Sequence, residues 1–150
     1  MSEPVSNLGK WRIDLLEEAG IHEFYYFTYL DNLPGILHFG ILPKNEVFKT
    51  GNAPRSFANE EVQKLRHDRI VELSNYQKIS VHNVVPVYLT PLTPTLYAVR
   101  EISLEIVFVV VEAKFIGNDS IQFCFTDGNA GASETKIYRN LRHHKPYLGK

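Results

Sequence analysis

The sequence predicts a single α+β domain, with a mostly antiparallel central sheet flanked by short helices. Segments with helical periodicity intermingle with segments rich in aromatic and β-branched residues, and their spacing lacks the regular strand–helix–strand repeat of a parallel sheet. The chain has 150 residues, which is enough for one hydrophobic core but not for two. We therefore expect residues 1–150 to form one domain.

The N-terminal third of the chain predicts a helix, a strand and a second helix in direct succession. Apolar residues spaced along one helix face predict the first helix over residues 11–18. The aromatic run 24–29, FYYFTY, is typical of a strand. After it, Asp31 or Asn32 is suited to cap a helix that carries a proline in its first turn and is followed by Gly40.

A long loop and then a helix are predicted for the middle of the chain. Residues 43–56 contain Pro, Gly and Asn and show no period. Residues 59–73 predict a helix with Asn59 as its N-cap, and Arg66 and Arg69 fall on or beside its inward face. Buried guanidinium groups need anionic or carbonyl partners, so this pair is either structural or part of a site.

The second half of the chain predicts three strands and a final helix. The continuous β-branched run 104–112 predicts a central strand. Before this strand, in a proline-rich stretch, Thr93 is suited to cap a single helical turn. The predicted strands cover residues 84–89, 104–112 and 121–126, and the predicted helix covers residues 130–141.

Composition argues against several classes of protein. Hydrophobic residues make up 44% and charged residues 22%, as in ordinary globular domains. The longest apolar run, residues 106–111, is far below the roughly 20 residues of a membrane span, and residues 1–10 lack the apolar segment of a signal peptide. The single Cys124 cannot form an internal disulfide, which fits a reducing compartment. We expect a cytoplasmic protein without membrane contact.

Three features remain as candidates for a site, because the sequence carries no P-loop, GxGxxG, HExxH, CxxC or GxSxG motif and its histidines are too scattered to predict a metal site. The features are the aromatic stretch 24–42, the pair Arg66 and Arg69, and the FTDGNAG turn at 125–131. Taken alone, each also fits an ordinary structural role, respectively a packed core strand, a set of salt bridges and a turn.

Together, the three features resemble the DarT family of bacterial toxins, which are DNA ADP-ribosyltransferases encoded beside a macrodomain antitoxin. Residues 25–37, YYFTYLDNLPGIL, resemble the opening motif of the family, and residues 56–69 correspond to a family helix with an arginine pair. The stretch 82–98, HNVVPVYLTPLTPTLYA, and the turn 125–130, FTDGNA, resemble two later blocks. The resemblance spans about residues 24–141.

The resemblance implies a fold of the ADP-ribosyltransferase type that consumes NAD and modifies a base in single-stranded DNA, with a macrodomain antitoxin as partner. It implies that the loop 43–56, which begins at Pro43, covers the cofactor, and that Arg66 is catalytic. The residues implied to contact NAD are Tyr26, Phe27, Thr28, Gly35, Pro43 and Arg66. The residues implied to contact the nucleic acid are Thr126, Asp127, Gly128 and Asn129.

The chain departs from the family pattern at the site. Tyr26, Tyr29 and Asn129 stand where relatives carry histidine, and the block with the catalytic glutamate has no counterpart in residues 1–150. We therefore expect a fold that lacks part of its central sheet at the C-terminus. Besides an active transferase, an inactive or truncated relative that binds a nucleotide or single-stranded nucleic acid without turnover stays open, as does a protein-interaction domain.

Overall fold

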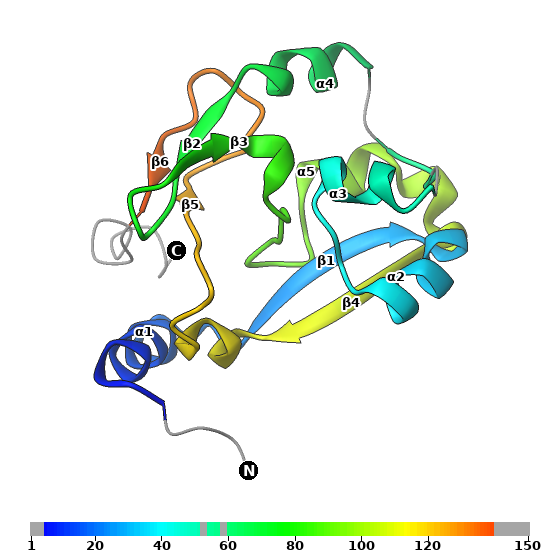
Figure 1. Cartoon of the computed structure of the whole chain (residues 1–150). Helices are drawn as coiled ribbons and strands as arrows, with labels where there is room; N and C mark the ends of the chain where they lie inside the picture. The colour runs from blue at the N-terminus through cyan, green and yellow to red at the C-terminus, as the bar shows by residue number, and fades with distance from the viewer. Residues whose placement is uncertain (1–4, 52–53, 58–59, 140–150) are drawn as a thin grey trace.

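The computed structural model describes residues 5–51, 54–57 and 60–139, and it has the predicted α+β class (Figure 1). The elements, with η for 3-10 helices, are α1 (Asn7–Glu18), β1 (Glu23–Tyr29), η1 (Leu30–Asn32), α2 (Leu33–Phe39), α3 (Lys44–Lys49), α4 (Glu60–His67), β2 (Ile70–Glu72), β3 (Lys78–Ser80), η2 (Val81–Asn83), α5 (Pro94–Ala98), η3 (Arg100–Glu105), β4 (Ile106–Glu112), η4 (Ala113–Gly117), β5 (Phe125–Thr126) and β6 (Ile137–Tyr138). Within these ranges the strands form three antiparallel ladders, β1–β4, β2–β3 and β5–β6. None of the described helices is long and apolar enough to cross a membrane.

The β1–β4 ladder is the longest and runs the full length of both strands. On its other edge, β1 exchanges two backbone hydrogen bonds of 2.8 Å between Tyr25 and Tyr88. β1 therefore has neighbours on both edges and buries Phe24, Phe27 and Thr28. The aromatic residues at 24–29 form a strand as predicted, and this strand is the inner one.

The predicted strand 104–112 forms as β4, but its predicted central position is wrong. Among the described residues β4 pairs with β1 alone, and its side chains Phe108 and Val110 are 40% and 50% exposed. The predicted strand 84–89 reduces to a single bridge to β1. Pro86 in this segment has no N–H to donate, so a continuous ladder cannot form there.

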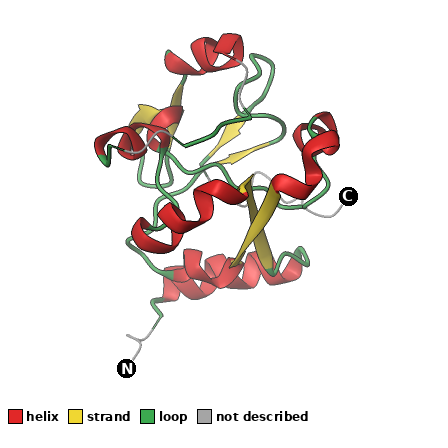
Figure 2. Cartoon of the chain, turned by 90° about the vertical axis from the view of Figure 1, so that its right-hand side faces the viewer, coloured by secondary structure: helices red, strands yellow, loops and turns green. Residues whose placement is uncertain are grey.

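Helix α1 lies at the end of the ladder where β1 begins and β4 ends (Figures 1 and 2). It begins earlier than predicted, because the Ser6 hydroxyl accepts a hydrogen bond of 2.9 Å from the backbone N–H of Gly9 and caps the helix. A Cβ on Gly9 would overlap the carbonyl oxygen of Gly117 in η4. Glycine at this position therefore lets the two backbones touch.

Arg12 of α1 fixes the segment that follows η4. The residue is 5% exposed, and its Nη1 donates to the carbonyl oxygens of Ile116, Asn118 and Ile121 at 3.2, 3.4 and 3.5 Å. Its guanidinium carbon lies 4.9 Å from the ring centre of Phe123. One hydrophobic core cluster consists of Leu16, Phe24, Ala113, Ile116 and Phe125.

The middle of the chain differs from the sequence prediction in two places. The predicted loop 43–56 contains α3, whose first turn is closed by the carbonyl oxygen of Pro43. The predicted helix 59–73 ends at His67, because residues 70–72 pair with β3 as β2. Both departures are decided by contacts with distant segments, which override weak local propensity.

The C-terminal part also differs. The predicted strand 121–126 reduces to β5, and the predicted helix 130–141 is wrong over its described residues, which turn back and pair as β6. The predicted cap Asn59 and residues 140–141 lie outside the described ranges.

Replacing Arg12 with methionine tests the role of its donors. Arg12→Met keeps most of the packing but removes the hydrogen bonds to three carbonyl oxygens, so we expect the free energy of unfolding to fall by about 2–3 kcal/mol. Denaturant unfolding measures this change. Lys10→Met on the exposed face of α1 is the control, and equal stability of the two variants would contradict the role given to Arg12.

Candidate functional site

The residues predicted from the aromatic stretch lie where β1 runs into η1. Thr28 is 5% exposed, and its hydroxyl oxygen accepts a hydrogen bond of 2.9 Å from the side-chain amide of Asn32. Phe27 is buried and stacks on Tyr88 with 5.2 Å between ring centres. Tyr26 is half-buried, and burial raises the pKa of its phenol, an effect that the hydroxyl of Thr28 opposes. Tyr26 is therefore neutral at physiological pH.

Asn32 joins the end of β1 to the segment 54–57. Besides holding Thr28, its amide N–H donates to the carbonyl oxygen of Arg55 at 2.8 Å. Its amide oxygen accepts from the backbone N–H of Arg55 at 3.1 Å. Asn32 occupies the predicted N-cap position of α2, but its side chain makes no capping hydrogen bond, so this part of the prediction is wrong. The side chain instead binds a segment that is distant in sequence.

We call the contacts that hold the segment 54–57 against the end of β1 the clasp. Besides the hydrogen bonds of Asn32, it includes the exposed guanidinium of Arg55. Its central carbon lies 3.9 Å from the ring centre of Tyr29, and its Nη1 bridges Asp31 at 3.2 Å and Glu105 at 2.6 Å. Glu105 and then Asp31 raise the already high pKa of Arg55. The ring of Phe57 stacks on Tyr29 with 4.2 Å between centres. The segment 54–57 is thereby held against the end of β1.

Gly35 and Pro43 are both predicted to contact a ligand. They follow Asn32 in the sequence, in α2 and at the start of α3. Gly35 is in α2, and a Cβ built on it meets no atom within 4 Å, so open space adjoins its backbone. Pro43 is the N-cap of α3, and its carbonyl oxygen accepts from the backbone N–H groups of Glu46 and Val47 at 2.9 and 3.1 Å.

Arg66, at the end of α4, lies against the predicted nucleic-acid turn. Its Nη2 donates a hydrogen bond of 2.6 Å to the side-chain oxygen of Asn129. The same oxygen accepts from the backbone N–H of Gly131 at 2.9 Å. A Cβ on Gly131 would overlap the Nε of Arg66, so glycine is required for this close approach. The structure thus brings a predicted catalytic residue together with a predicted nucleic-acid residue.

Arg69 holds the next part of the same loop. Its guanidinium donates to the carbonyl oxygen of Ala132 and, over 2.6 Å, to that of Thr135. The partners of both arginines are therefore neutral oxygens, and in the described part of the chain neither arginine forms an ion pair with a carboxylate. The sequence predicts either anionic or carbonyl partners for these two guanidinium groups. The structure shows carbonyl partners.

The predicted turn is a hairpin between β5 and β6. One carboxylate oxygen of Asp127 accepts from the backbone N–H of Lys136 at 2.9 Å, and the hydroxyl of Thr126 donates to the carbonyl oxygen of Gly128 at 2.7 Å. The backbone φ of Gly128 is not positive. A Cβ there would lie 2.9 Å from the hydroxyl oxygen of Thr135, so close approach is what favours glycine. Asp127 closes the hairpin and does not cap a helix.

The predicted site residues fall into two groups, one at the end of β1 and one at Arg66 and the turn 126–129. Helix α3 connects these two groups. It lies between α2 and α4 in Figure 1, and the Nζ of Lys44 donates to the side-chain oxygen of Gln63 in α4 at 2.5 Å. Within the described ranges, no hydrogen bond or ion pair joins Arg66 directly to the end of β1. The predicted covering loop is therefore partly a helix that spans the distance between the two groups.

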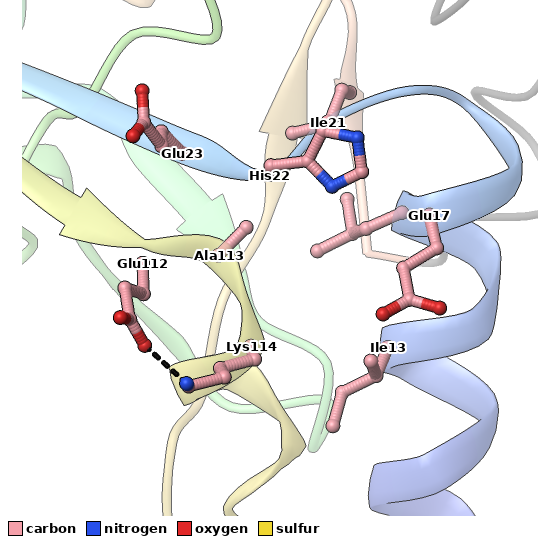
Figure 3. Close-up of a pocket in the computed structure, with 9 residues that line it drawn as sticks. Ile13, Glu17, Ile21, His22, Glu23, Glu112, Ala113 and Lys114 are labelled. Carbon is pink, nitrogen blue, oxygen red and sulfur yellow. Dashed lines mark ion pairs between the residues drawn. The ribbon is translucent and has the colours of Figure 1, made fainter.

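A groove at the opposite end of the β1–β4 ladder does not fit a phosphate-bearing ligand. It has a volume of about 310 Å³ and lies between α1 and the ends of β1 and β4 (Figure 3). Its lining includes Glu17, Glu23 and Glu112, and of these Glu112 is paired with Lys114 at 2.5 Å. Carboxylates repel phosphates, and none of the predicted site residues lines this groove. We therefore place the candidate site at the end of β1 and at Arg66, not in the groove.

Sequence reasoning missed Asn32 as the residue that joins Thr28 to the backbone of Arg55. An asparagine between a strand and a proline indicates a helix cap, and no local pattern distinguishes a cap from a clasp that spans 23 residues. It also missed the buried His82, because one histidine in a loop-like stretch carries no periodic signal. No group of three or more His, Cys, Asp or Glu residues in the described ranges is placed to hold a metal ion.

A family model described as ssDNA thymidine ADP-ribosyltransferase, DarT, matches residues 25–145. The chain belongs to the DarT family. The match includes both groups of predicted residues, from Tyr26 to Asn129.

Curated relatives of this DarT chain carry names of the same kind. A DNA ADP-ribosyl transferase–DNA ADP-ribosyl glycohydrolase fusion protein of Thermosipho africanus is 34% identical over 121 residues, which are 78% of this chain and 29% of the relative. A DNA ADP-ribosyl transferase of Thermus aquaticus is 30% identical over 129 residues, with 81% of this chain and 56% of the relative covered. One of Mycobacterium tuberculosis is 31% identical over 126 residues, with 78% and 53% covered.

Solved structures show the same fold. Thermosipho africanus DarTG in complex with ADP-ribose matches with a TM-score of 0.66 and 30% identity over 79% of this chain and 31% of that one. Thermus sp. 2.9 DarT in complex with ADP-ribosylated ssDNA matches with a TM-score of 0.69 and 27% identity over 87% and 63%. The predicted fold of the ADP-ribosyltransferase type is therefore confirmed. The chain spans between 29% and 57% of the length of the curated relatives.

Removing the side chain of Asn32 tests the clasp at the end of β1. Asn32→Ala removes three hydrogen bonds, so we expect the free energy of unfolding to fall by about 1–2 kcal/mol and the amide of Arg55 to exchange faster with solvent. Hydrogen exchange and denaturant unfolding measure the two effects. Asn7→Ala, at the exposed start of α1, is the control, and unchanged exchange at Arg55 would argue against the clasp.

Two glycines provide a matched test of the Arg66 contact. Gly131→Ala forces the guanidinium of Arg66 away from Asn129, and we expect a loss of about 1 kcal/mol in thermal unfolding. Gly35→Ala enters open space within a helix and should be neutral or stabilising by up to about 1 kcal/mol. The opposite order of stability would contradict the packing of Arg66 on Gly131.

Proposed function

We propose that this chain is the transferase part of a toxin that moves ADP-ribose from NAD to thymidine in single-stranded DNA, and that its antitoxin is a macrodomain protein. The hydrogen bond of 2.6 Å between Arg66 and Asn129 carries the proposal. It joins the residue expected to act on the cofactor to the turn expected to present the base. Relatives in complex with ADP-ribose and with ADP-ribosylated ssDNA support both ligands.

The reaction breaks one bond and forms one, with no change of oxidation state. The bond between the ribose C1′ and the nicotinamide nitrogen breaks, and nicotinamide leaves as a neutral molecule. A nitrogen or oxygen atom of the thymine base forms the new bond to C1′, and the base loses a proton. The domain has to hold the diphosphate, stabilise the positive ribose in the transition state and align the base.

Arg66 is suited to the electrostatic part of this task. Asn129 holds its Nη2, and Gly131 lies against its Nε, so the guanidinium is fixed before a ligand arrives. Its described partners are neutral, which leaves its positive charge for an anion. A fixed guanidinium can bind a phosphate through two N–H groups or stabilise a thymine base that has lost its proton.

The end of β1 is suited to the nicotinamide. Tyr26 is neutral and partly accessible, so it offers a flat face beside the hydroxyl of Thr28. Asn32 fixes that hydroxyl, and the open space at Gly35 lets a ligand reach the backbone of α2. Helix α3, with Pro43 as its N-cap, lies between α2 and α4 in Figure 1, and we expect the dinucleotide to run along it from the end of β1 to Arg66.

A second candidate function is nucleotide or single-stranded DNA binding without turnover. Within the described ranges, no carboxylate contacts Arg66 or Thr28. Glu134 is the acid that follows the turn, but it is exposed and accepts a hydrogen bond of 3.1 Å from Ser133. Its own backbone N–H, then Ser133, lower the pKa of Glu134, so this carboxylate is ionised and bound locally. No described acid is therefore bonded to Arg66 or Thr28, and the carboxylates of Asp31 and Glu105 at the end of β1 are paired with Arg55.

Incubation of the chain with NAD and a short oligonucleotide tests the proposal. We expect mass spectrometry to find a gain of one ADP-ribose on an oligonucleotide that contains thymidine and none on one that lacks it. Arg66→Ala should lower the initial rate by about 100-fold to 1000-fold, since a fixed charge at the reacting centre is lost. Lys64→Ala, an exposed cation on the same helix, is the matched control and should keep the wild-type rate.

The outcomes separate the two functions. If NAD raises the melting temperature but no adduct forms, the chain is a binding module and the proposed activity is wrong. If adduct formation and NAD binding both survive in Arg66→Ala, the assignment of Arg66 is wrong.

A further inference from the structure

Three elements that are distant in sequence meet at one junction beside Arg66. A hydrogen bond of 2.5 Å joins Asn45 of α3 to Asn83 of η2, and another of 2.5 Å joins Lys44 of α3 to Gln63 of α4. Helices α3 and α4 both pack against η2. Side chains from all three elements therefore have fixed positions relative to one another.

The charged and titratable groups that act on the His82 ring are all basic. His82 of η2 is 8% exposed, and its ring centre lies 6.1 Å from that of His67 in α4. Lys44 from α3 and Arg66 from α4 are close enough to act on the His82 ring electrostatically. In the described part of the chain, no carboxylate is among the groups that act on this ring. The surroundings of the His82 ring are therefore positive, and the carboxylate of Glu46 in α3 is paired with Lys49 at 2.7 Å.

Two buried nitrogen atoms at this junction have no hydrogen-bond partner among the described residues. They are the Nε2 of His82 and the Nε of Arg66. Buried polar atoms of folded proteins are almost always paired, so an unpaired atom in a basic cluster points to a missing partner. A phosphate oxygen fits the Nε2 of His82, because it accepts hydrogen bonds and carries negative charge, whereas the Nε of Arg66 is covered by Gly131.

We propose that Lys44, His67 and His82 form, with Arg66, a subsite for phosphate-ester oxygen atoms. The ligand is either the diphosphate of a dinucleotide or a phosphodiester of single-stranded DNA, which share this chemistry. The inference rests in part on the proposed function, because Arg66 belongs to both. It gives a binding role to three basic residues, two of them histidines.

The histidines make binding at this subsite depend on pH. Burial and then the charges of Lys44, His67 and Arg66 lower the pKa of His82, so its ring is neutral near pH 7 in the free protein. A bound phosphate reverses the local charge and raises this pKa, so the protein takes up a proton with the ligand. Binding therefore strengthens as pH falls. Without ligand, protonation of His82 favours the unfolded chain, so stability falls as pH drops below the ordinary histidine pKa of about 6.5.

Calorimetric titration of the whole chain at pH 6 and pH 8 tests the subsite. The probes are ADP-ribose and an oligothymidylate, whose phosphate charges stay constant over this range, and adenosine as a ligand without phosphate. We expect about 3-fold to 10-fold tighter binding of a phosphate-bearing probe at pH 6 and no such change for adenosine. His82→Gln should abolish the pH dependence, and Lys44→Gln should weaken binding at both pH values.

His22→Gln is the matched control, because His22 is exposed in the groove of Figure 3 and should keep the wild-type pH dependence. A response of ADP-ribose alone assigns the subsite to the diphosphate, and a response of the oligothymidylate alone assigns it to DNA. If ADP-ribose and the oligothymidylate each bind equally at both pH values, and His82→Gln and Lys44→Gln match the wild type with both probes, the subsite is wrong while the proposed function stands. If neither phosphate-bearing probe binds, both proposals fail.

Discussion

The antiparallel pairing of β1 with β4 is the constraint on which the rest of the structure depends. Side chains alternate along a strand, so the register of this ladder decides which residues of the aromatic stretch face the core. At one end of the ladder, Phe24 joins the core that α1 and η4 cover. At the other end, Thr28 meets Asn32 and the segment that contains Arg55. A slip of one residue would move Phe24 and Thr28 together to the opposite face of the ladder, away from these partners.

Arginines that bind neutral oxygens recur in this chain: Arg12 is buried, and Arg66 and Arg69 are half-buried. Arg12 holds three carbonyl groups after η4, and Arg69 holds two in the loop between β5 and β6. These segments have little regular structure, and a guanidinium with five donors can fix several irregular carbonyl groups at once. Arg66 is held in the same way, through Asn129. The arrangement orders the loop while leaving the charge of Arg66 without an acid partner.

The two ends of the molecule have opposite electrostatic character. The groove beside α1 is lined by three glutamates, whereas the junction of α3, α4 and η2 gathers lysine, arginine and histidine side chains. A ligand that carries phosphates is attracted to the second and repelled by the first, although the overall net charge is only −1. The distribution of charge is therefore more informative about partners than its sum.

The sequence by itself determined the class of the fold, the strand at 24–29, the cap at Thr93, whose hydroxyl accepts from the N–H of Leu96, and the DarT family. These features depend on local chemistry or on ordered motifs. Only the tertiary structure decided that 70–72 is a strand, that 130–139 turns back as a hairpin arm, and that Asn32 clasps Arg55. The physical reason is that strand pairing, side-chain clasps and close glycine contacts join residues distant along the chain, whose proximity no local pattern records.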